Sequence, residues 1–273
     1  MDLRKKRLLE AKAKKIRYLT MDELGHLGVG HVGGCLSIAD VLSVLYFSEM
    51  KIDPKNPKKE GRDRLVLSKG HAGPALYAAL AERGYFDPAL LHTLNQPHTL
   101  LPSHCDMLRT PGVDMTAGSL GQGISCAVGM AKAAKILGES SYVYCIIGDG
   151  ESQEGQVWEA SMAAAQFKLD NLIVFLDDNG LQIDGAVRQI NSIEVPGRRW
   201  AAFGFHTFDV NGHDVEEIED AIEAAKAEKG APSMIVLHTV KGKGVSFVEA
   251  AGVKNHNMPI TPEQTQQALR ELA

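Results

Sequence analysis

Two acidic turns follow two apolar runs, and their spacing constrains the fold more than any other feature of the chain. The run Tyr142–Ile147 leads directly into Gly148-Asp149-Gly150, and the run Leu172–Leu176 leads into Asp177-Asp178-Asn179-Gly180. Short apolar runs bounded by such turn residues are typical of buried β-strands. Twenty-eight residues separate Gly150 from Asn179, about the length of a helical crossover between parallel neighbours. Asp149 and Asn179 should therefore meet at the carboxyl edge of one sheet, where open α/β sheets bind ligands.

The residue types expected at this edge suit a metal ion bound to a diphosphate. Glycines on both sides of Asp149 would let backbone N–H groups approach a phosphate, and a helix that starts at about Glu154 would add its positive end. A carboxylate, an amide and a backbone carbonyl near Leu181 are oxygen ligands that Mg2+ accepts. The alternative is a pair of ordinary turns in which Asp149 and Asn179 only cap helices. The pairing of both turns at this spacing favours the ligand site.

The rest of the chain alternates helices and strands. The expected helices span residues 1–25, 37–50, 73–84, 124–137 and 215–229, with a short polar helix at the end of the chain. The further strands are expected at 65–67, 207–210 and 234–239. Pro97–Thr116 should be mostly irregular, and Lys241–Asn257 should be a glycine-bearing loop. This order predicts an α/β fold, a parallel twisted sheet with helices on both faces, in a single domain 1–273.

Composition places the chain among globular proteins. Apolar residues make up 44%, charged residues 23%, and the net charge is −5, which gives no general attraction for nucleic acid. The N-terminal helix is rich in lysine and arginine, a pattern that favours a solvated helix face over an anionic partner. No run of eighteen apolar residues, no secretory signal and no paired cysteine spacing is present, so we expect a reduced, cytoplasmic protein with no membrane partner.

Three sequence segments resemble the thiamine-diphosphate enzymes, and transketolase in particular. They are LSKGHAGPALYAAL, TAGSLGQGISCAVGMA, and GDGESQEGQVWEA with DDNGLQIDG, and they follow one another in the order that the family shows. The resemblance runs from about Ile16 to His256 but covers only the N-terminal third to half of a full transketolase. It implies the thiamine-diphosphate-binding fold, of which this chain would be the diphosphate module, with thiamine diphosphate and Mg2+ as cofactors.

The resemblance also implies roles for individual residues. The implied magnesium ligands are Asp149, Asn179 and the backbone carbonyl of Leu181. The implied cofactor-binding residues are His71, Gly118, Ser119, Leu120, Gly148, Asp149, Gly150, Glu154, Asn179 and His256. The implied catalytic residues, which would contact sugar hydroxyls or move protons, are His31, His71, His104 and His256. Departures from the family pattern occur at Val32, at Ser103-His104-Cys105-Asp106 and at Asn255-His256-Asn257, and an altered sugar pocket would account for them.

The family's pyrimidine-binding glutamate belongs to a second module that this sequence does not contain. We therefore expect one subunit of a split transketolase, active only with a C-terminal partner subunit, in an α2β2 heterotetramer that acts on sugar phosphates. The small-residue helix Gly123–Ala134 is either part of that interface or an internal helix. Two other functions remain open: the α subunit of a 2-oxoacid dehydrogenase, and a non-catalytic module for assembly or regulation. Xylulose or fructose phosphates are the default donors, and a branched or sulfonated sugar is an alternative.

Overall fold

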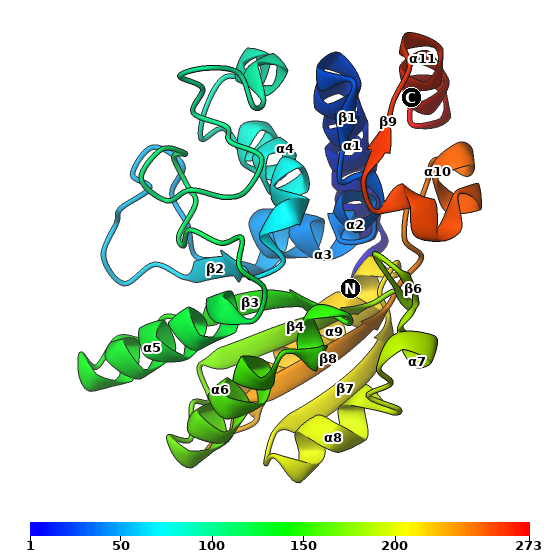
Figure 1. Ribbon diagram of the computed structural model, residues 1–273. Coiled ribbons are helices and arrows are strands. Elements are labelled where there is room, and N and C mark those ends of the chain that lie inside the picture. Colours follow the sequence, from blue (N-terminus) through cyan, green and yellow to red (C-terminus); the bar gives the residue numbers. More distant parts are fainter.

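The computed structural model describes all residues 1–273, and its centre is a five-stranded parallel sheet (Figure 1). In spatial order, its strands are β2 (Arg64–Leu67), β3 (Val143–Gly148), β4 (Leu172–Asp178), β8 (Ser233–His238) and β7 (His206–Asn211). All four pairings are parallel. The expected α/β sheet is therefore confirmed, and each strand that the apolar runs predicted is present to within two residues.

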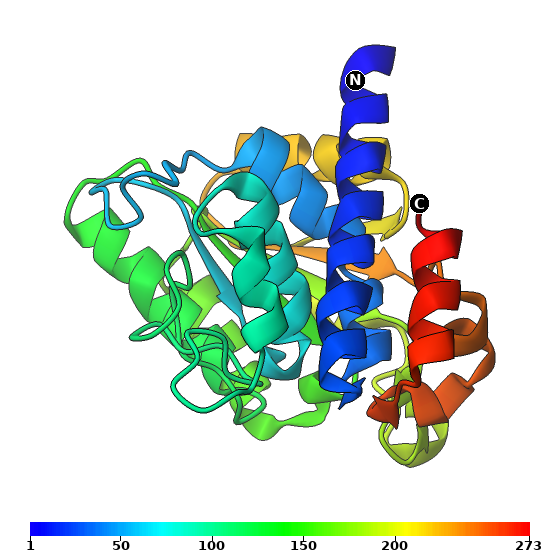
Figure 2. The same ribbon diagram turned by 90° about the horizontal axis from the view of Figure 1, so that it is seen from above.

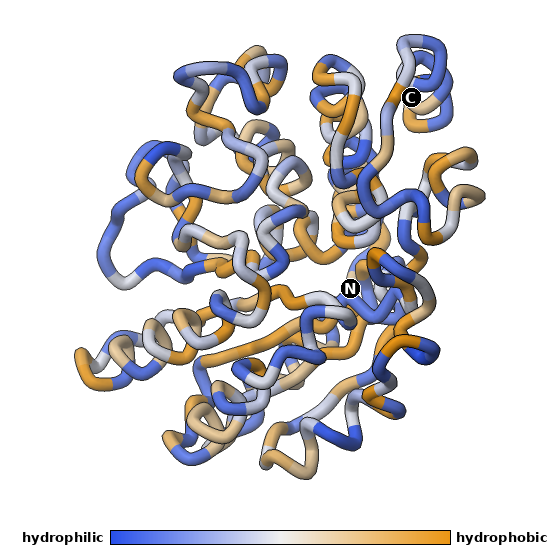
Figure 3. The backbone as a smooth tube through the Cα atoms, in the orientation of Figure 1, coloured by the Kyte–Doolittle hydropathy of each residue, from blue (hydrophilic) through white to orange (hydrophobic).

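Helices cover both faces of the sheet (Figure 1). On one face lie α1 (Leu3–Leu27), α3 (Ala39–Val44), α4 (Gly73–Arg83) and α9 (Val215–Ala227). On the other lie α5 (Gln122–Ile136), α6 (Gly155–Gln166) and α8 (Pro196–Ala202). Alternate strand residues enter the two cores, so Tyr144 and Ile146 pack on one side while Cys145 and Ile147 pack on the other. The hydropathy colouring shows the apolar residues running along these strands (Figure 3).

The remaining elements are short and lie mostly around the carboxyl edge of the sheet. They are α2 (Val32–Leu36), α7 (Val187–Ile190), α10 (Ser246–Ala250), α11 (Pro262–Glu271), β1 (Val29–Gly30), β5 (Leu181–Gln182), β6 (Gly185–Ala186) and β9 (Met258–Pro259). β5 and β6 form a hairpin, and β1 pairs antiparallel with β9. No helix combines the length and the apolar character that a membrane span requires.

The segment Lys241–Asn257 differs from the expected loop. It contains α10 and a 3-10 helix at Gly252–Asn255. The buried amide of Asn255 donates to the carbonyl oxygens of Lys241 and Val248, both at 3.0 Å, and so closes the segment on itself. A five-residue helix is too short to show helical periodicity in the sequence, which is why the pattern predicts only a loop here.

Four of the eight lysines and arginines of α1 form ion pairs within the chain. Lys5 contacts Glu219, Lys6 contacts Glu216, Lys12 contacts Glu82, and Arg17 contacts Asp40. α1 packs beside α11 and across α3 and α4 (Figure 2). These pairs favour an internal packing role for the basic helix over attraction of an anionic partner.

One carboxyl group in α1 is buried without a partner. Glu23 has no exposed surface, and neither of its carboxyl oxygens has a hydrogen-bond partner. Burial, helped by the neighbouring charge of Asp22, raises the pKa of Glu23 well above its usual value. Glu23 therefore keeps its proton in the folded state at pH values where an exposed glutamate is ionised.

Candidate active site

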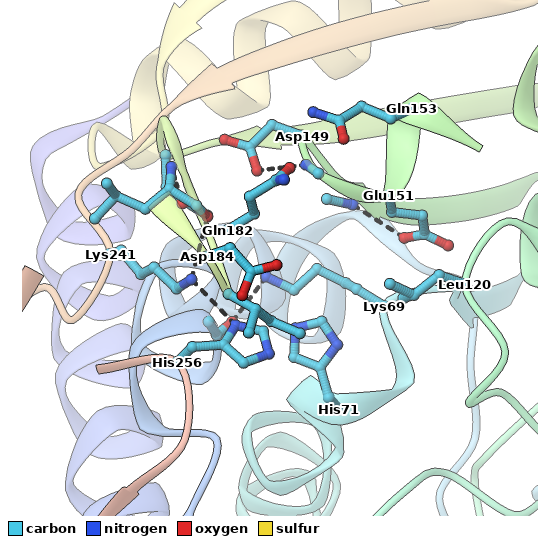
Figure 4. Close-up of a pocket in the computed structure, with 16 residues that line it drawn as sticks. Lys69, His71, Leu120, Asp149, Glu151, Gln153, Gln182, Asp184, Lys241 and His256 are labelled. Atoms are coloured by element: carbon cyan, nitrogen blue, oxygen red, sulfur yellow. Dashed lines mark hydrogen bonds between the residues drawn. The ribbon is translucent and has the colours of Figure 1, made fainter. Parts of the chain in front are cut away.

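A cavity of about 180 Å³ lies at the carboxyl edge of the sheet, where β3 and β4 end (Figure 4). Its walls come from the ends of these strands, the β5–β6 hairpin, the turn before α4, and the segments that carry Lys241 and His256. Gly148 pairs with Asp177 in the β3–β4 ladder, so the two acidic turns leave the sheet side by side. The spacing of the two turns therefore predicted their neighbouring positions correctly.

Asp149 is held by the backbone of both turns. One carboxylate oxygen accepts a hydrogen bond from the Gly150 N–H at 2.7 Å, and the other accepts one from the Gly180 N–H at 2.6 Å. The residue is only 3% exposed. Burial, with the nearby charge of Asp177, raises the pKa of Asp149 to about 7. A bound cation would offset the cost of holding this carboxylate in its charged form.

Asn179 is oriented by the fully buried Asp177. Its side-chain N–H group donates to Asp177 Oδ2 at 2.9 Å, while Asn179 Oδ1 accepts the Leu181 N–H at 3.1 Å. Lys69 Nζ donates to the same Asp177 oxygen at 2.6 Å. Although burial alone would raise the pKa of Asp177, the Lys69 ammonium holds it below its usual value. Asp177 thus links a cavity lysine to the amide that was expected to bind metal.

A second lysine reaches the cavity from the segment after β8. Lys241 Nζ donates to the Leu181 carbonyl oxygen at 3.1 Å and lies 3.2 Å from His256 Nδ1. Burial and the nearby Lys69 lower the pKa of Lys241 to about 8. Two cationic side chains therefore line the cavity next to the expected oxygen ligands.

The donor set of this cavity fits a magnesium ion bound to a diphosphate. It contains a carboxylate, an amide oxygen and a backbone carbonyl for the hard cation, and two lysines for phosphate oxygens. The chain has no group of three or more His, Cys, Asp or Glu residues that could hold a metal, so a metal here would depend on the amide and carbonyl oxygens. Gln182 adds a buried side-chain oxygen without a hydrogen-bond partner. A side chain at Gly150 would lie only 3.0 Å from Gln182, which explains the glycine.

Four histidines form one cluster at the rim of the cavity. The ring centroid of His31 lies 5.4 Å from that of His71, 5.8 Å from that of His104 and 5.3 Å from that of His256. The rings of His71 and His256 are 5.1 Å apart. The β1–β9 ladder brings His31 close to His256. Gly30, which precedes His31, pairs with Met258, which lies two residues after His256.

Three members of the cluster, His31, His71 and His256, are held in their neutral form. Burial, followed by nearby cationic groups, lowers the pKa of His31, His71 and His256, the last to about 4. A neutral imidazole has one donor and one acceptor nitrogen, so it can both accept a proton from a hydroxyl and donate one.

A buried glutamate joins this cavity to the glycine turn that precedes α5. Glu151 is 2% exposed and accepts hydrogen bonds from the Ser68 hydroxyl at 2.5 Å, the Gly121 N–H at 2.9 Å and the Gly148 N–H at 3.1 Å. This one carboxylate therefore forms hydrogen bonds with the ends of β2 and β3 and with the turn Gly118–Gly121.

Some expected site residues line the cavity and others lie beside it. The lining includes His71, Leu120, Gly148, Asp149, Gly150, Asn179, Leu181 and His256. The other expected residues, which lie outside the lining, are His31, His104, Gly118, Ser119 and Glu154. His31 and His104 belong to the histidine cluster, a Cβ at Gly118 would lie 3.7 Å from the His104 ring, and Glu154 is exposed at the start of α6.

Sequence reasoning missed four buried polar residues at this site: Lys69, Glu151, Asp177 and Lys241. Lys69 and Glu151 stand inside the quoted motifs, and Asp177 belongs to the same acidic turn as Asn179. Lys241 lies three residues after the last residue of β8, so its position near a strand end was the available signal.

The sequence and the fold both match known proteins. A family model described as "Transketolase, thiamine diphosphate binding domain" matches residues 9–273. The chain is 57% identical to a 6-deoxy-6-sulfo-D-fructose transketolase subunit of Clostridium sp., over 97% of this chain and 96% of that one. It is 38% identical to an apulose-4-phosphate transketolase subunit of Phocaeicola vulgatus, over 97% and 94% of the two chains.

Solved structures show the same similarity. The transketolase of Campylobacter jejuni superposes with a TM-score of 0.90 and 37% identity, over 100% of this chain and 43% of that one. The transketolase of Leishmania mexicana gives a TM-score of 0.90 and 34% identity, over 95% and 40% of the two chains. This chain thus spans about two-fifths of the solved proteins that it matches.

Proposed function

Because this chain belongs to the transketolase family and comprises its thiamine-diphosphate-binding domain, we propose that it is the diphosphate-binding subunit of a two-chain transketolase. One observation carries the proposal: Asp149, Asn179 and the Leu181 carbonyl lie at neighbouring strand ends beside Lys69 and Lys241. The subunit names of the similar proteins support it. These relatives favour transketolase over the 2-oxoacid dehydrogenase and the non-catalytic module.

The chain's own residues would hold the cofactor at its diphosphate end. Asp149, Asn179 and the Leu181 carbonyl would bind Mg2+, and Lys69 and Lys241 would neutralise phosphate oxygens. Thiamine diphosphate, when bound, supplies an electron sink for cleavage of the bond between the second and third carbons of a ketose.

The histidine cluster would bind and deprotonate the sugar. In its neutral form, His31 can accept a proton from a sugar hydroxyl and return it. His104 would contact the same hydroxyls, while His71 and His256 border the cofactor cavity. Because the cluster is partly buried, water has limited access to the reacting atoms. The proposed reaction moves a two-carbon ketol unit from a ketose to an aldose.

We assign the remaining cofactor contacts to a separate pyrimidine-binding subunit. Leu120 is 37% exposed at the cavity, and Glu154 is exposed close by, so this side of the site is open to a partner. The outer face of α5 exposes Gly129 and Ala133, while its inner residues pack on the sheet. α5 is thus both an internal helix and a candidate interface in the proposed α2β2 assembly.

The donor would be a ketose with a terminal anion. Similar proteins carry the names of a sulfonated fructose and of apulose 4-phosphate, so the proposal includes phosphorylated and sulfonated ketoses.

The test is reconstitution with a pyrimidine-module subunit. Titration calorimetry should show that the chain and its partner together bind thiamine diphosphate only with Mg2+ present. A coupled assay should then show ketol transfer from xylulose 5-phosphate or 6-deoxy-6-sulfofructose. Magnesium-independent binding, or full activity of the isolated chain, would refute the proposal.

A further inference from the structure

A separate cavity of about 180 Å³ lies beside His31 and shares no lining residue with the cofactor cavity. Its lining includes Gly30, Ser103 and Asn257, which are the chain neighbours of His31, His104 and His256. The histidine cluster therefore borders two cavities, since His71 and His256 line one and His31 lines the other. A side chain at Gly30 would lie 2.5 Å from a terminal methyl of Leu24, so any larger residue would displace that side chain.

The lining of this second cavity contains polar groups but no charged side chain. Its hydrogen-bonding groups are the His31 imidazole, the Ser103 hydroxyl and the amides of Asn95 and Asn257, and the rest of the wall is mostly apolar. Although Asn95 and Asn257 are exposed, a phosphate or sulfonate placed against this lining would lose part of its water without gaining a cation. Hydroxyl groups, by contrast, match neutral donors and acceptors.

Asn95 is held in an unusual backbone conformation. Its φ angle is 58°, in the left-handed region that most side chains avoid. Its N–H donates to the Leu101 carbonyl oxygen at 2.9 Å, which fixes the backbone there. Asparagine adopts this region more readily than most residues, so the conformation is compatible with the side chain present.

We propose that this cavity, called here the neutral subsite, binds an uncharged, hydroxyl-bearing portion of the sugar substrate. Asn95 and Asn257 are its specificity-determining residues, and the charged end of the sugar is bound elsewhere. This inference rests on the proposed function, because the histidine cluster would place the reacting carbons next to the neutral subsite.

The test uses Asn95→Gly, which removes the amide while glycine readily adopts the positive φ. The matched control is His98→Gly, because His98 lies in the same irregular segment with φ 64° and does not line the cavity. Saturation-transfer NMR would measure binding of erythritol, a neutral four-carbon polyol, to the chain assembled with its pyrimidine-module partner in the presence of Mg2+ and thiamine diphosphate. Asn95→Gly should reduce the transferred signal about threefold or more, as loss of one hydrogen bond predicts, and His98→Gly should leave it unchanged.

Kinetics of the reconstituted enzyme give a second readout. Asn95→Gly and Asn257→Ala should each raise KM for the sugar about 3- to 10-fold with kcat nearly unchanged, because each removes one neutral hydrogen bond. No erythritol signal in the wild type, or equal signals in wild type and Asn95→Gly, would overturn the inference. Cofactor binding is measured by calorimetry on the same samples. If the cofactor binds and the erythritol result is negative, the neutral subsite is wrong; if the cofactor does not bind, the proposed function is wrong.

Discussion

The buried carboxyl group of Glu23 makes the stability of this protein depend on pH in a way that one substitution should reveal. Glu23 has no exposed surface and no hydrogen-bond partner, and burial raises its pKa well above the usual value. The folded state therefore holds one more proton than the unfolded state at pH values between the two pKa values. This extra proton stabilises the folded state fully at pH values below the pKa of Glu23 in the unfolded chain. The stabilisation is lost as the pH rises toward the pKa of Glu23 in the folded protein.

The magnitude follows from proton linkage. One proton bound only by the folded state changes the free energy of unfolding by about 1.4 kcal/mol for each pH unit. Between pH 5.5 and 7.5, one such proton can lower the free energy of unfolding of the wild type by at most about 2.7 kcal/mol. Glu23→Gln has nearly the same shape but cannot ionise, so its stability should fall less steeply with pH.

Urea denaturation at several pH values measures this difference. Other buried carboxyl groups with raised pKa values, such as Asp114 and Glu151, contribute equally to both proteins, so the difference in slope isolates Glu23. Glu10→Gln, at an exposed position of the same helix, is the matched control and should follow the wild type. If the curves of wild type and Glu23→Gln run parallel, the buried carboxyl group does not hold an extra proton.

Three further substitutions test the site. Asp149→Ala should weaken magnesium-dependent cofactor binding about 100-fold or more in calorimetry, since it removes a proposed metal ligand, while circular dichroism stays unchanged; equal affinity would contradict the assignment. Glu151→Gln replaces one of the two accepting carboxylate oxygens with an NH2 group that would face a hydrogen-bond donor, so cofactor affinity should fall about 10-fold. Glu159→Gln on the exposed face of α6 should have no effect. Asp177→Asn leaves the ammonium of Lys69 buried without its counter-charge, and thermal and urea denaturation should show a loss of about 3 kcal/mol; a loss below about 1 kcal/mol would mean that Lys69 finds another partner.

The sheet and the acidic turns could be predicted because they depend on local patterns. Apolar runs mark β3 and β4, and the crossover length between Gly150 and Asn179 places the turns side by side. The roles of the four histidines came instead from the family resemblance, since an isolated histidine in a glycine turn carries little information by itself.

Contacts between distant parts of the chain could not be predicted in this way. The pairing of Val29–Gly30 with Met258–Pro259 involves two residues on each side, too few for any periodic signal. Lys69 donates a hydrogen bond to the buried carboxylate of Asp177, and Lys241 donates one to the carbonyl oxygen of Leu181. Both lysines are buried, although lysines are exposed in most proteins. Their burial follows from the tertiary structure around Asp177, which no local pattern contains.

The β1–β9 ladder has a consequence for how the protein matures. It joins residues near the start of the chain to residues close to its end, and loop closure over such a separation is slow compared with local helix formation. During synthesis, the strands through β8 can pair before Met258 leaves the ribosome, but His31 and His256 cannot yet be neighbours. Catalytic competence should therefore arise after the sheet has formed, and a chain shortened before Met258 would keep its sheet without acquiring the histidine cluster.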